Sequence, residues 1–227
     1  MKHKQVIEHF SKQADEYEEL MVKIVPQYRK QHEIIYDLLP TERTKKYRVL
    51  DLGCGNGILS ELVFKKLLHS FIVGFDLTEN MLRAYDKKLS NYSGRFELKL
   101  ADYRTDSIGA NYDIVIAGLT LHHLTWDERK EFYKTIYYAL NEDGIFISRD
   151  IIIDEDPDVK MYQYSLWKDY MRSKGEDPEF WFAKHMEKDH PITLSDHFMW
   201  LKEAGFVKIA CQWRLYNFAI TTAVKEF

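Results

Sequence analysis

The sequence predicts an α/β protein in which a mostly parallel sheet is covered by helices on both faces. Short apolar strand-like segments alternate with helix-like segments between residues 47 and 148, at the spacing of βαβ units. The chain has 227 residues, 45% of them hydrophobic and 30% charged, which is typical of one globular domain. We therefore expect a single domain over residues 1–227.

The chain begins with a helical region. Residues 3–39 carry apolar residues at helical spacing among many charged ones. Pro26 divides this region, because proline starts helices more readily than it continues them. We expect two helices here.

Five strands follow, each a short run of apolar or alternating residues. They are expected at Val49–Leu52, Phe71–Phe75, Arg95–Ala101, Asp113–Ala117 and Ile145–Ser148. Helices are expected between them at Ile58–His69, from Thr78 as a cap to Leu89, and from Thr125 to Leu140. The last helix begins with a capping box, in which Thr125 and Glu128 satisfy each other's backbone donors.

Residues 151–192 interrupt this alternation. A helix with Tyr164, Trp167 and Met171 on one stripe is followed by the aromatic, histidine-bearing stretch Glu179–Pro191. We interpret 151–192 as a cap insertion over the acceptor site, that is, over the place where the molecule to be modified would bind. The chain ends with a helix and then an antiparallel hairpin of two strands: Thr193–Ala204, Phe206–Trp213 and Asn217–Val224.

Composition excludes several classes of protein. The net charge of −4, without a long basic block, disfavours a nucleic-acid substrate, because backbone recognition needs a basic face. Cys54 and Cys211 make neither a disulfide framework nor a metal-type pair, and we expect Cys54 to pack in the core. The polar start of the chain and its short apolar runs predict a cytoplasmic protein without a membrane partner.

A turn with three glycines follows the first strand and leads into a helix. Gly53, Gly55 and Gly57 allow backbone N–H groups to approach a ligand closely. The dinucleotide fingerprint has its third glycine where this chain has Ile58. Asp51 precedes the turn, and its charge is unfavourable beside a pyrophosphate but suits an ammonium group. Both features argue against NAD.

Two further acids follow strands. Asp76 ends the second strand, where a carboxylate can hold two ribose hydroxyls, and Asp102 follows the third and can accept a hydrogen bond from an exocyclic amine. With Asp51, they mark the carboxyl ends of successive strands, where open α/β sheets bind ligands. The sequence therefore predicts a nucleoside-containing ligand at this edge.

In order along residues 47–150, the segments "VLDLGCGNG", "GFDLTENML", "LADY" and "YDIVIAGLTLHHL" resemble the motifs of class I S-adenosylmethionine-dependent methyltransferases. The resemblance implies an enzyme with a Rossmann-like, seven-stranded, mostly parallel sheet and one antiparallel strand. It also implies S-adenosyl-L-methionine as cofactor and S-adenosyl-L-homocysteine as product. The segment "HFSKQADEYEEL" resembles the lead-in helix of small-molecule methyltransferases, so residues 1–40 are expected to form a lid.

The resemblance assigns the parts of the cofactor. Asp51 and the glycines would face the methionine part, Asp76 the ribose, and Asp102 with Tyr103 the adenine. On the lid, Tyr17 would lie against the sulfonium and Arg29 would meet the methionine carboxylate. The full set of expected cofactor-binding residues is Tyr17, Arg29, Asp51, Gly53, Gly55, Asn56, Asp76, Leu77, Met81, Asp102, Tyr103, Ala117 and Gly118.

His122 and His123, just past the fourth strand, are the candidate general bases. Adjacent residues point in different directions, so one of them at most is expected to face the methyl group. Asp150 ends the fifth strand and would orient an imidazole, while Arg149 would point to the other face. This arrangement resembles that of some small-molecule O-methyltransferases.

A metal site is the alternative for a second group of polar residues. It would combine Asp150 with the polar residues of the insertion and the next helix: His185, Asp189, His190, Asp196 and His197. His185 and His190 are five residues apart, not the four that would place two ligands on one helical face. The favoured interpretation is a polar lid without a metal.

The leading hypothesis is methyl transfer from S-adenosylmethionine to a small-molecule acceptor by direct in-line displacement. One alternative is a tRNA wobble-uridine modifier, because the "DEY…LHHL" layout resembles the group that makes carboxy-S-adenosylmethionine or methylates uridine-5-oxyacetate. The sequence "GCGNG" replaces the glycine-serine form of the carboxy-cofactor synthases, which counts against that role. A non-catalytic cofactor-binding module would also carry the same motifs, and an NAD-dependent oxidoreductase is a weaker hypothesis.

Overall fold

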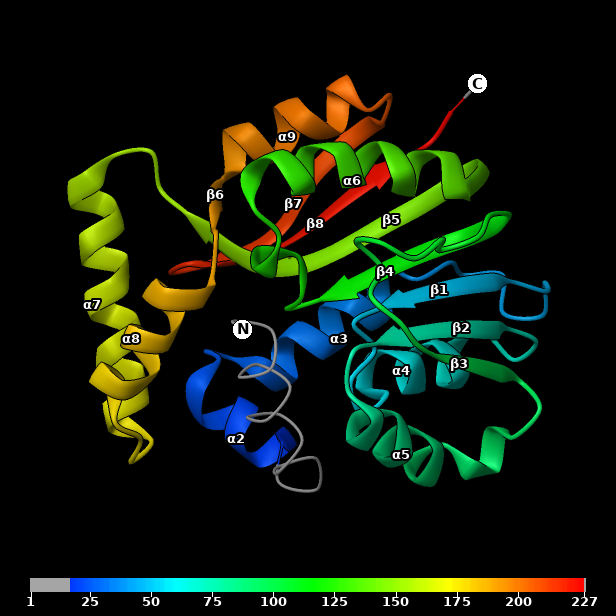
Figure 1. Cartoon of the computed structure of the whole chain (residues 1–227), viewed down its shortest axis with the longest axis horizontal. Coiled ribbons are helices and arrows are strands. Elements are labelled where there is room, and N and C mark those ends of the chain that lie inside the picture. Colours follow the sequence, from blue (N-terminus) through cyan, green and yellow to red (C-terminus); the bar gives the residue numbers. More distant parts are fainter. Residues whose placement is uncertain (1–16, 227) are drawn as a thin grey trace.

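The sheet of the computed structural model, which describes residues 17–226, has the strand order β3-β2-β1-β4-β5-β8-β7 (Figure 1). Neighbouring strands are parallel, except that β8 runs antiparallel to both β5 and β7. This confirms the predicted fold class. A two-residue strand, β6, pairs with the end of β5 and was not predicted. The strands are β1 Arg48–Leu52, β2 Phe71–Asp76, β3 Phe96–Leu100, β4 Tyr112–Gly118, β5 Leu140–Ile153, β6 Ile192–Thr193, β7 Val207–Leu215 and β8 Phe218–Val224.

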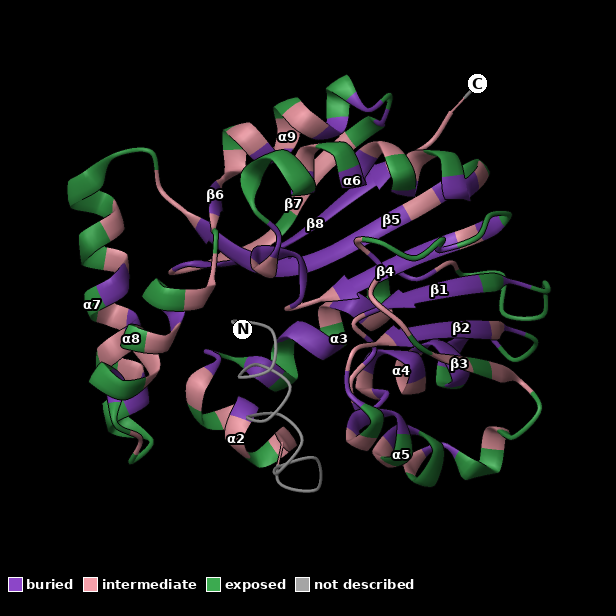
Figure 2. Ribbon diagram, viewed as in Figure 1, coloured by how far each residue is buried: buried purple, intermediate pink, exposed green. Residues whose placement is uncertain are grey.

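Helices cover both faces of the sheet (Figure 1). One face packs α3, α4 and α5 around residues such as Val63 and Ile114, and the other packs α6 and α9 around Tyr133 and Val115. The inner strands are therefore mostly buried (Figure 2), whereas the edge strands β3 and β7 contain no buried residue. The helices are α2 Tyr17–Ile24, α3 Tyr28–Leu38, α4 Ile58–Lys66, α5 Glu79–Lys88, α6 Trp126–Ala139, α7 Pro157–Ser173, α8 Pro178–Lys188 and α9 Leu194–Glu203, with 3₁₀ turns η1 Ser90–Tyr92 and η2 Leu121–His123.

The central strand β5 is longer than predicted. The sequence pattern indicated residues 145–148, whereas β5 runs from Leu140 to Ile153. The reason is its two partners, because β5 pairs with β4 along one edge and with β8 along the other. Residues 141–144, which separate the predicted helix from the predicted strand, lie within β5, with Asp143 in the left-handed region at φ 58°.

The helical lead-in divides near Pro26 as predicted, because α2 ends at Ile24 and α3 begins at Tyr28. Most of the "HFSKQADEYEEL" motif lies outside the described residues, which begin at Tyr17. The predicted stripe on α7 is also confirmed. Its three residues are buried in one apolar cluster with α2 and the end of β5: Met21, Val25, Tyr28, Ile151, Tyr164, Trp167, Met171 and Phe218. Among the described residues, no helix is apolar and long enough to cross a bilayer.

Of the two predicted helix caps, one forms as expected. Thr125 and Glu128 make both halves of the capping box at the start of α6. Thr78 stands at the N-cap of α5, but its side chain makes no capping hydrogen bond. Its backbone N–H instead donates to Oδ1 of Asp76 at 2.8 Å. Thr78 is thus the N-cap residue as predicted, but its backbone N–H bonds to Asp76 and its side chain makes no capping hydrogen bond.

The glycine turn gives a prediction about stability. Gly57 has φ +81°, and a Cβ there would lie 2.7 Å from Cδ2 of Tyr85. Gly94 has φ +80° with nothing within 4 Å of such a Cβ. Gly57→Ala and Gly94→Ala therefore share the backbone strain, and only Gly57→Ala adds a clash in the core. We expect Gly57→Ala to lower the free energy of unfolding by about 1–3 kcal/mol more than Gly94→Ala.

Urea denaturation of both variants measures this difference, and Gly94→Ala is the matched control. Equal losses in the two variants would show that the packing of Tyr85 against the turn contributes nothing.

Candidate functional site

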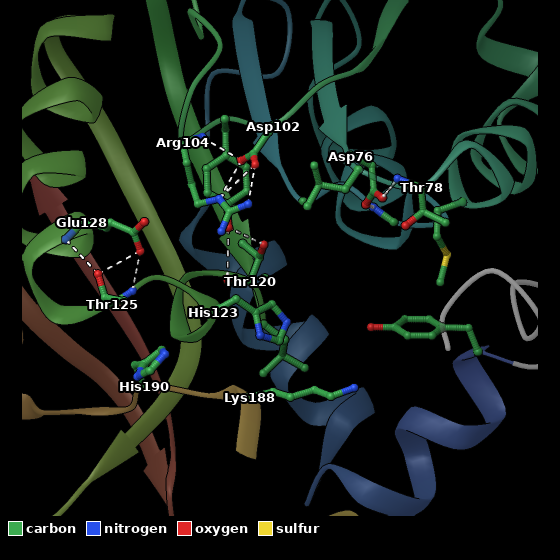
Figure 3. Close-up of a pocket in the computed structure, with 18 of the residues that line it drawn as sticks. Asp76, Thr78, Asp102, Arg104, Thr120, His123, Thr125, Glu128, Lys188 and His190 are labelled. Atoms are coloured by element: carbon green, nitrogen blue, oxygen red, sulfur yellow. Dashed lines mark hydrogen bonds and ion pairs between the residues drawn. The ribbon is translucent and has the colours of Figure 1, made fainter. Parts of the chain in front are cut away.

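A cavity of about 330 Å³ lies at the carboxyl ends of the first four strands (Figure 3). Each of the four loops that follow these strands contributes to its wall, which makes it the crevice that open α/β sheets use for ligands. The loop residues are Gly53 and Gly55 after β1, Asp76, Leu77 and Thr78 after β2, Asp102, Tyr103 and Arg104 after β3, and Gly118, Leu119 and Thr120 after β4.

A second cavity, of about 130 Å³, adjoins the first, and the two share Tyr17, Leu119, His123 and Lys188 as lining residues. Its walls are mostly apolar and come from α2, the end of β5, α7 and α8: Met21, Ile24, Val25, Ile151, Trp167, Trp181 and Phe218. Polar groups gather at one end, namely His122, His123, Lys184, His185, Lys188 and Asp189. Two ligands can therefore lie side by side.

Asp76 links the glycine turn to the end of β2. Its Oδ2 accepts a hydrogen bond from the N–H of Gly55 at 2.9 Å, and its Oδ1 accepts one from the N–H of Thr78 at 2.8 Å. Burial raises the pKa of Asp76, although these backbone donors act in the opposite direction. The carboxylate faces the first cavity, as Figure 3 shows.

Asp51 lies beneath the glycine turn. It is 1% exposed, does not line the first cavity, and accepts a hydrogen bond on Oδ2 from the hydroxyl of Ser60 at 2.6 Å. Burial raises the pKa of Asp51 to about 7, because removal from water disfavours the charged form more than Ser60 stabilises it. Asp51 therefore bonds to Ser60 in the interior of the protein and does not face the first cavity.

On the third loop, Asp102 forms an ion pair with Arg104, whose Nε donates to Oδ1 of Asp102 at 2.8 Å. Both residues line the first cavity (Figure 3). Tyr103 is buried, and its hydroxyl lies 2.9 Å from Oγ1 of Thr120. The carboxylate of Asp102 thus already forms an ion pair with Arg104, a residue that sequence reasoning missed.

Nine of the predicted cofactor-binding residues line the first cavity: Tyr17, Gly53, Gly55, Asp76, Leu77, Met81, Asp102, Tyr103 and Gly118. The remaining four do not. Asp51, Asn56 and Ala117 are buried beneath it, and Arg29 is exposed on α3 and lines neither cavity. The assignment of Arg29 to a carboxylate of the ligand thus stays a prediction, which the lining of the two cavities does not support.

A different arginine, Arg149, lies near Asp51. Arg149 on β5 is 3% exposed, its guanidinium lies 4.9 Å from the ring centre of Tyr28, and its charge acts to lower the pKa of Asp51. Among the described residues, its Nε and Nη1 have no hydrogen-bond partner. Arg149 and Asp150 point to opposite faces of the sheet, as strand alternation predicted.

Asp150 connects His122 to a buried arginine. Its Oδ1 lies 2.5 Å from Nδ1 of His122, and its Oδ2 forms an ion pair with Nη2 of Arg129 at 2.9 Å. Burial raises the pKa of Asp150, but Arg129 and His122 outweigh it, so the pKa falls below its usual value. The predicted orientation of an imidazole by Asp150 agrees with this geometry. Because Nδ1 of His122 is occupied, Nε2 is the nitrogen left for a ligand.

Asp189, which directly follows α8, lies beside three histidines. Its Oδ1 accepts a hydrogen bond from Nδ1 of His123 at 3.1 Å and lies 3.8 Å from Nε2 of His122. Its Oδ2 accepts one from Nδ1 of His185 at 2.8 Å. Burial raises the pKa of Asp189, but His122 and these donors outweigh it and hold the pKa well below its usual value.

The two adjacent imidazoles do not diverge as expected. The ring centres of His122 and His123 are 4.2 Å apart, and both rings approach the same carboxylate of Asp189. Both residues lie in the 3₁₀ turn η2, from which their side chains reach Asp189 together. Burial lowers the pKa of His122, but Asp189 and Asp150 raise it more; the pKa of His123 falls because of burial and the neighbouring His122.

The metal set considered from the sequence is not assembled. His197 is buried between the hydroxyls of Tyr133 at 2.6 Å and Thr221 at 2.8 Å, and Asp196 lies at the start of α9. His190 lines the first cavity instead (Figure 3). The carboxylates of Asp150 and Asp189 do lie beside His122, with His185 behind Asp189.

Sequence reasoning missed Arg129, which holds the far side of Asp150. It is fully buried on α6, and its Nε donates to the hydroxyl of Tyr133 at 2.7 Å. The signal that could have found it was a charged residue four positions before Tyr133 on the apolar stripe of this helix.

The comparisons with known proteins agree with this geometry. A family model described as a methyltransferase domain matches residues 50–146. Carboxy-S-adenosyl-L-methionine synthase of Nautilia profundicola is 26% identical over 93% of this chain and 92% of its own length. The enzyme of the same name from Shewanella amazonensis is 28% identical over 95% of this chain and 91% of its own length.

Solved structures share the fold. A putative O-methyltransferase of Nostoc punctiforme matches with a TM-score of 0.68 and 16% identity, over 95% of this chain and 60% of that one. Human N-acetylserotonin methyltransferase in complex with SAM matches with a TM-score of 0.62 and 16% identity, over 87% and 52%. The chain thus spans little more than half of these two proteins. Together, the solved structures confirm the predicted Rossmann-like fold, and the family model identifies residues 50–146 as similar to a methyltransferase domain.

The buried Asp51 predicts how stability depends on pH. A carboxyl group whose pKa is raised by folding destabilises the folded state once it ionises, so its cost is absent below about pH 4 and complete above about pH 7. Asp51→Asn keeps an acceptor for Ser60 without this titration. We expect the variant to gain stability relative to the native chain as pH rises from 4.5 to 8.

Urea unfolding at several pH values, without cofactor, measures this difference. A constant difference between the two proteins over that range would contradict the raised pKa of Asp51.

Proposed function

We propose that this chain is a class I S-adenosylmethionine-dependent methyltransferase and that its methyl acceptor is a small molecule bound in the second cavity. The observation that carries the proposal is the shared wall of the two cavities, formed by Tyr17, Leu119, His123 and Lys188. A cofactor in the first cavity has its methyl group directed to the second only if the two spaces meet, as they do here. Direct in-line displacement requires this adjacency.

The placement of the cofactor follows the loops of the first cavity. We place the methionine part at Gly53 and Gly55, the ribose at Asp76, and the adenine beside Asp102 and Tyr103. The aromatic face of Tyr17, which lines both cavities, would attract the sulfonium at their junction. Asp51 and Asn56 would act from beneath the turn, because neither lines the cavity.

The second cavity indicates the kind of acceptor. Trp167, Trp181 and Phe218 give it flat apolar walls, and its volume of about 130 Å³ suits a molecule of about one ring. His122 and His123 face its polar end. An acceptor with a planar apolar body and one polar atom fits this combination, with the polar atom at the histidines and near the cofactor junction.

The chemistry that this arrangement supplies is mainly orientation. Holding the acceptor behind the methyl group can contribute up to about 7–11 kcal/mol to the lowering of a barrier in model systems. We propose that His122 and His123 contact the nucleophilic atom of the acceptor. Asp150 would act as a positioning residue, because it touches Nδ1 of His122 and leaves Nε2 for the acceptor side.

A second candidate function is suggested by the curated relatives, which are carboxy-S-adenosyl-L-methionine synthases matched over more than 90% of this chain. By its name, such an enzyme yields a cofactor that carries an additional carboxyl group. The products separate the two functions, because methyl transfer leaves S-adenosylhomocysteine. A nucleic-acid acceptor remains disfavoured by the net charge of −4 and by the small second cavity.

The role of Asp76 can be tested by binding alone. Asp76→Ala should weaken S-adenosylmethionine binding at least tenfold, because it removes a charged acceptor of hydrogen bonds, an interaction worth about 1.5–3 kcal/mol. Glu79→Ala is the matched control, since it removes the same charge from an exposed site three residues away. Isothermal titration calorimetry measures both affinities. Equal affinities in the two variants would mean that the ribose lies elsewhere.

The function itself is tested by labelled methyl transfer. The enzyme is incubated with methyl-labelled S-adenosylmethionine and a metabolite extract, with and without nuclease, and the cofactor products are identified by mass spectrometry. We expect label in small molecules, unaffected by nuclease, and S-adenosylhomocysteine as product. Label only in nuclease-sensitive material, or a carboxylated cofactor, would overturn the proposal.

His122 provides the site-directed check. We expect His122→Ala to reduce methyl transfer about 10²-fold or more while S-adenosylmethionine affinity stays within twofold, because His122 lines only the second cavity. An unchanged rate would contradict the placement of the acceptor.

A further inference from the structure

We infer that His122, His123 and Asp189 form a binding site for a divalent transition-metal ion at the polar end of the second cavity. One ligand atom of each residue lies within 4.8 Å of the others, and all three residues line this cavity. The sequence alone suggested a different and dispersed set. The site combines residues from η2 with the residue that follows α8, more than sixty positions later.

The separations of the ligand atoms fit a metal ion. Oδ1 of Asp189 lies 3.1 Å from Nδ1 of His123 and 3.8 Å from Nε2 of His122. Ligand atoms about 2.1 Å from a tetrahedral ion lie about 3.4 Å from one another. The two measured distances lie on either side of this value, so small side-chain rotations are enough to place all three atoms around one ion.

Two of the three ligands, His122 and Asp189, also have a partner behind them. Nδ1 of His122 is held by Asp150, and Asp150 is held by Arg129. Oδ2 of Asp189 accepts a hydrogen bond from His185, whose Nε2 lies 3.1 Å from the hydroxyl of Tyr164. Outer partners of this kind fix the orientation and the tautomer of metal ligands, and the carboxylate–histidine pair is the commonest of them.

The charges favour a cation at this point and not elsewhere in the cluster. Arg129 already neutralises Asp150. Among residues 17–226, the ion pairs of Asp189 are with histidines alone and not with lysine or arginine. A metal ion would replace the proton shared between Nδ1 of His123 and Asp189, and would provide the charge that this buried carboxylate needs.

The ligand set indicates the class of metal. Two imidazole nitrogens and one carboxylate oxygen suit zinc, iron, cobalt, nickel or manganese, whereas magnesium and calcium prefer oxygen ligands alone. Three protein ligands leave at least one coordination position open, which is typical of a catalytic and not a structural site. That position faces the second cavity, because its lining contains all three ligands.

The role of the ion rests on the proposed function and narrows the acceptor to a hydroxyl compound. The ion would lie between the two imidazoles and the acceptor oxygen, so that their contact with this atom is made through the metal. The hydroxyl oxygen would bind at the open position, and its proton would pass to solvent because coordination lowers its pKa. An electron pair of this oxygen then forms the bond to the methyl carbon. The bond from sulfur to that carbon breaks, and its electron pair remains on sulfur as a neutral thioether.

Metal binding is tested without any acceptor. Tag-free, chelator-treated protein is titrated with Co²⁺, and binding is followed by calorimetry and by the visible absorption of the ion. We expect one Co²⁺ per chain in the native protein, at least 100-fold weaker binding in His123→Ala and Asp189→Ala, and unchanged binding in His69→Ala, a control at an exposed histidine. Asp150→Asn should weaken binding 10–100-fold, because it removes only the outer partner of His122.

Cooperative thermal unfolding of each variant, followed by circular dichroism, shows that it is folded. Absence of stoichiometric Co²⁺ binding in the native protein, or binding that survives both His123→Ala and Asp189→Ala, would overturn the metal site. Methyl transfer that continues at full rate in chelator, with no Co²⁺ bound, would contradict the role of the metal but agree with the proposed function. Specific Co²⁺ binding without any methylated small molecule would support the metal site but contradict the proposed function.

Discussion

The buried carboxylate of Asp150 is the interaction on which the second cavity depends. It lies at the end of β5 between the guanidinium of Arg129 on α6 and the imidazole of His122 on η2. Removing Arg129 would leave the carboxylate as an uncompensated charge in the core, which typically costs about 3–5 kcal/mol. The sheet, a covering helix and the loop after β4 are therefore held in one relative position, and the orientation of His122 follows from it.

The same arrangement continues into the insertion. Asp189 receives hydrogen bonds from His123 and His185, and the N–H of His190 donates to the carbonyl of His122 at 2.6 Å. On the opposite side of the cavity, α7 packs against α2 and β5 through Trp167 and Met171. The insertion is thus held by polar contacts at one end and by apolar contacts at the other. His123, Trp167 and Asp189, which make these contacts, also line the second cavity.

The first cavity depends on close backbone approach. The strand order reverses at β1, with β2 on one side and β4 on the other, and this is where open α/β sheets leave a crevice. A side chain at Gly53 would collide with Thr120 of the loop after β4. Asp76 holds the other side of the turn through the N–H of Gly55. The close approach of these three loops therefore shapes the cavity at this edge.

Local patterns in the sequence were enough for the alternating strands and helices, the capping box at Thr125 and the order of the cofactor motifs. Periodicity and turn chemistry are properties of neighbouring residues, so they can be recognised without the fold. Tertiary structure alone decided the length of β5, the exposure of Arg29, and the burial of Arg129 beside Asp150. It also decided that His122 and His123 share Asp189, because that contact joins residues 66 and 67 positions apart through packing that no local pattern contains.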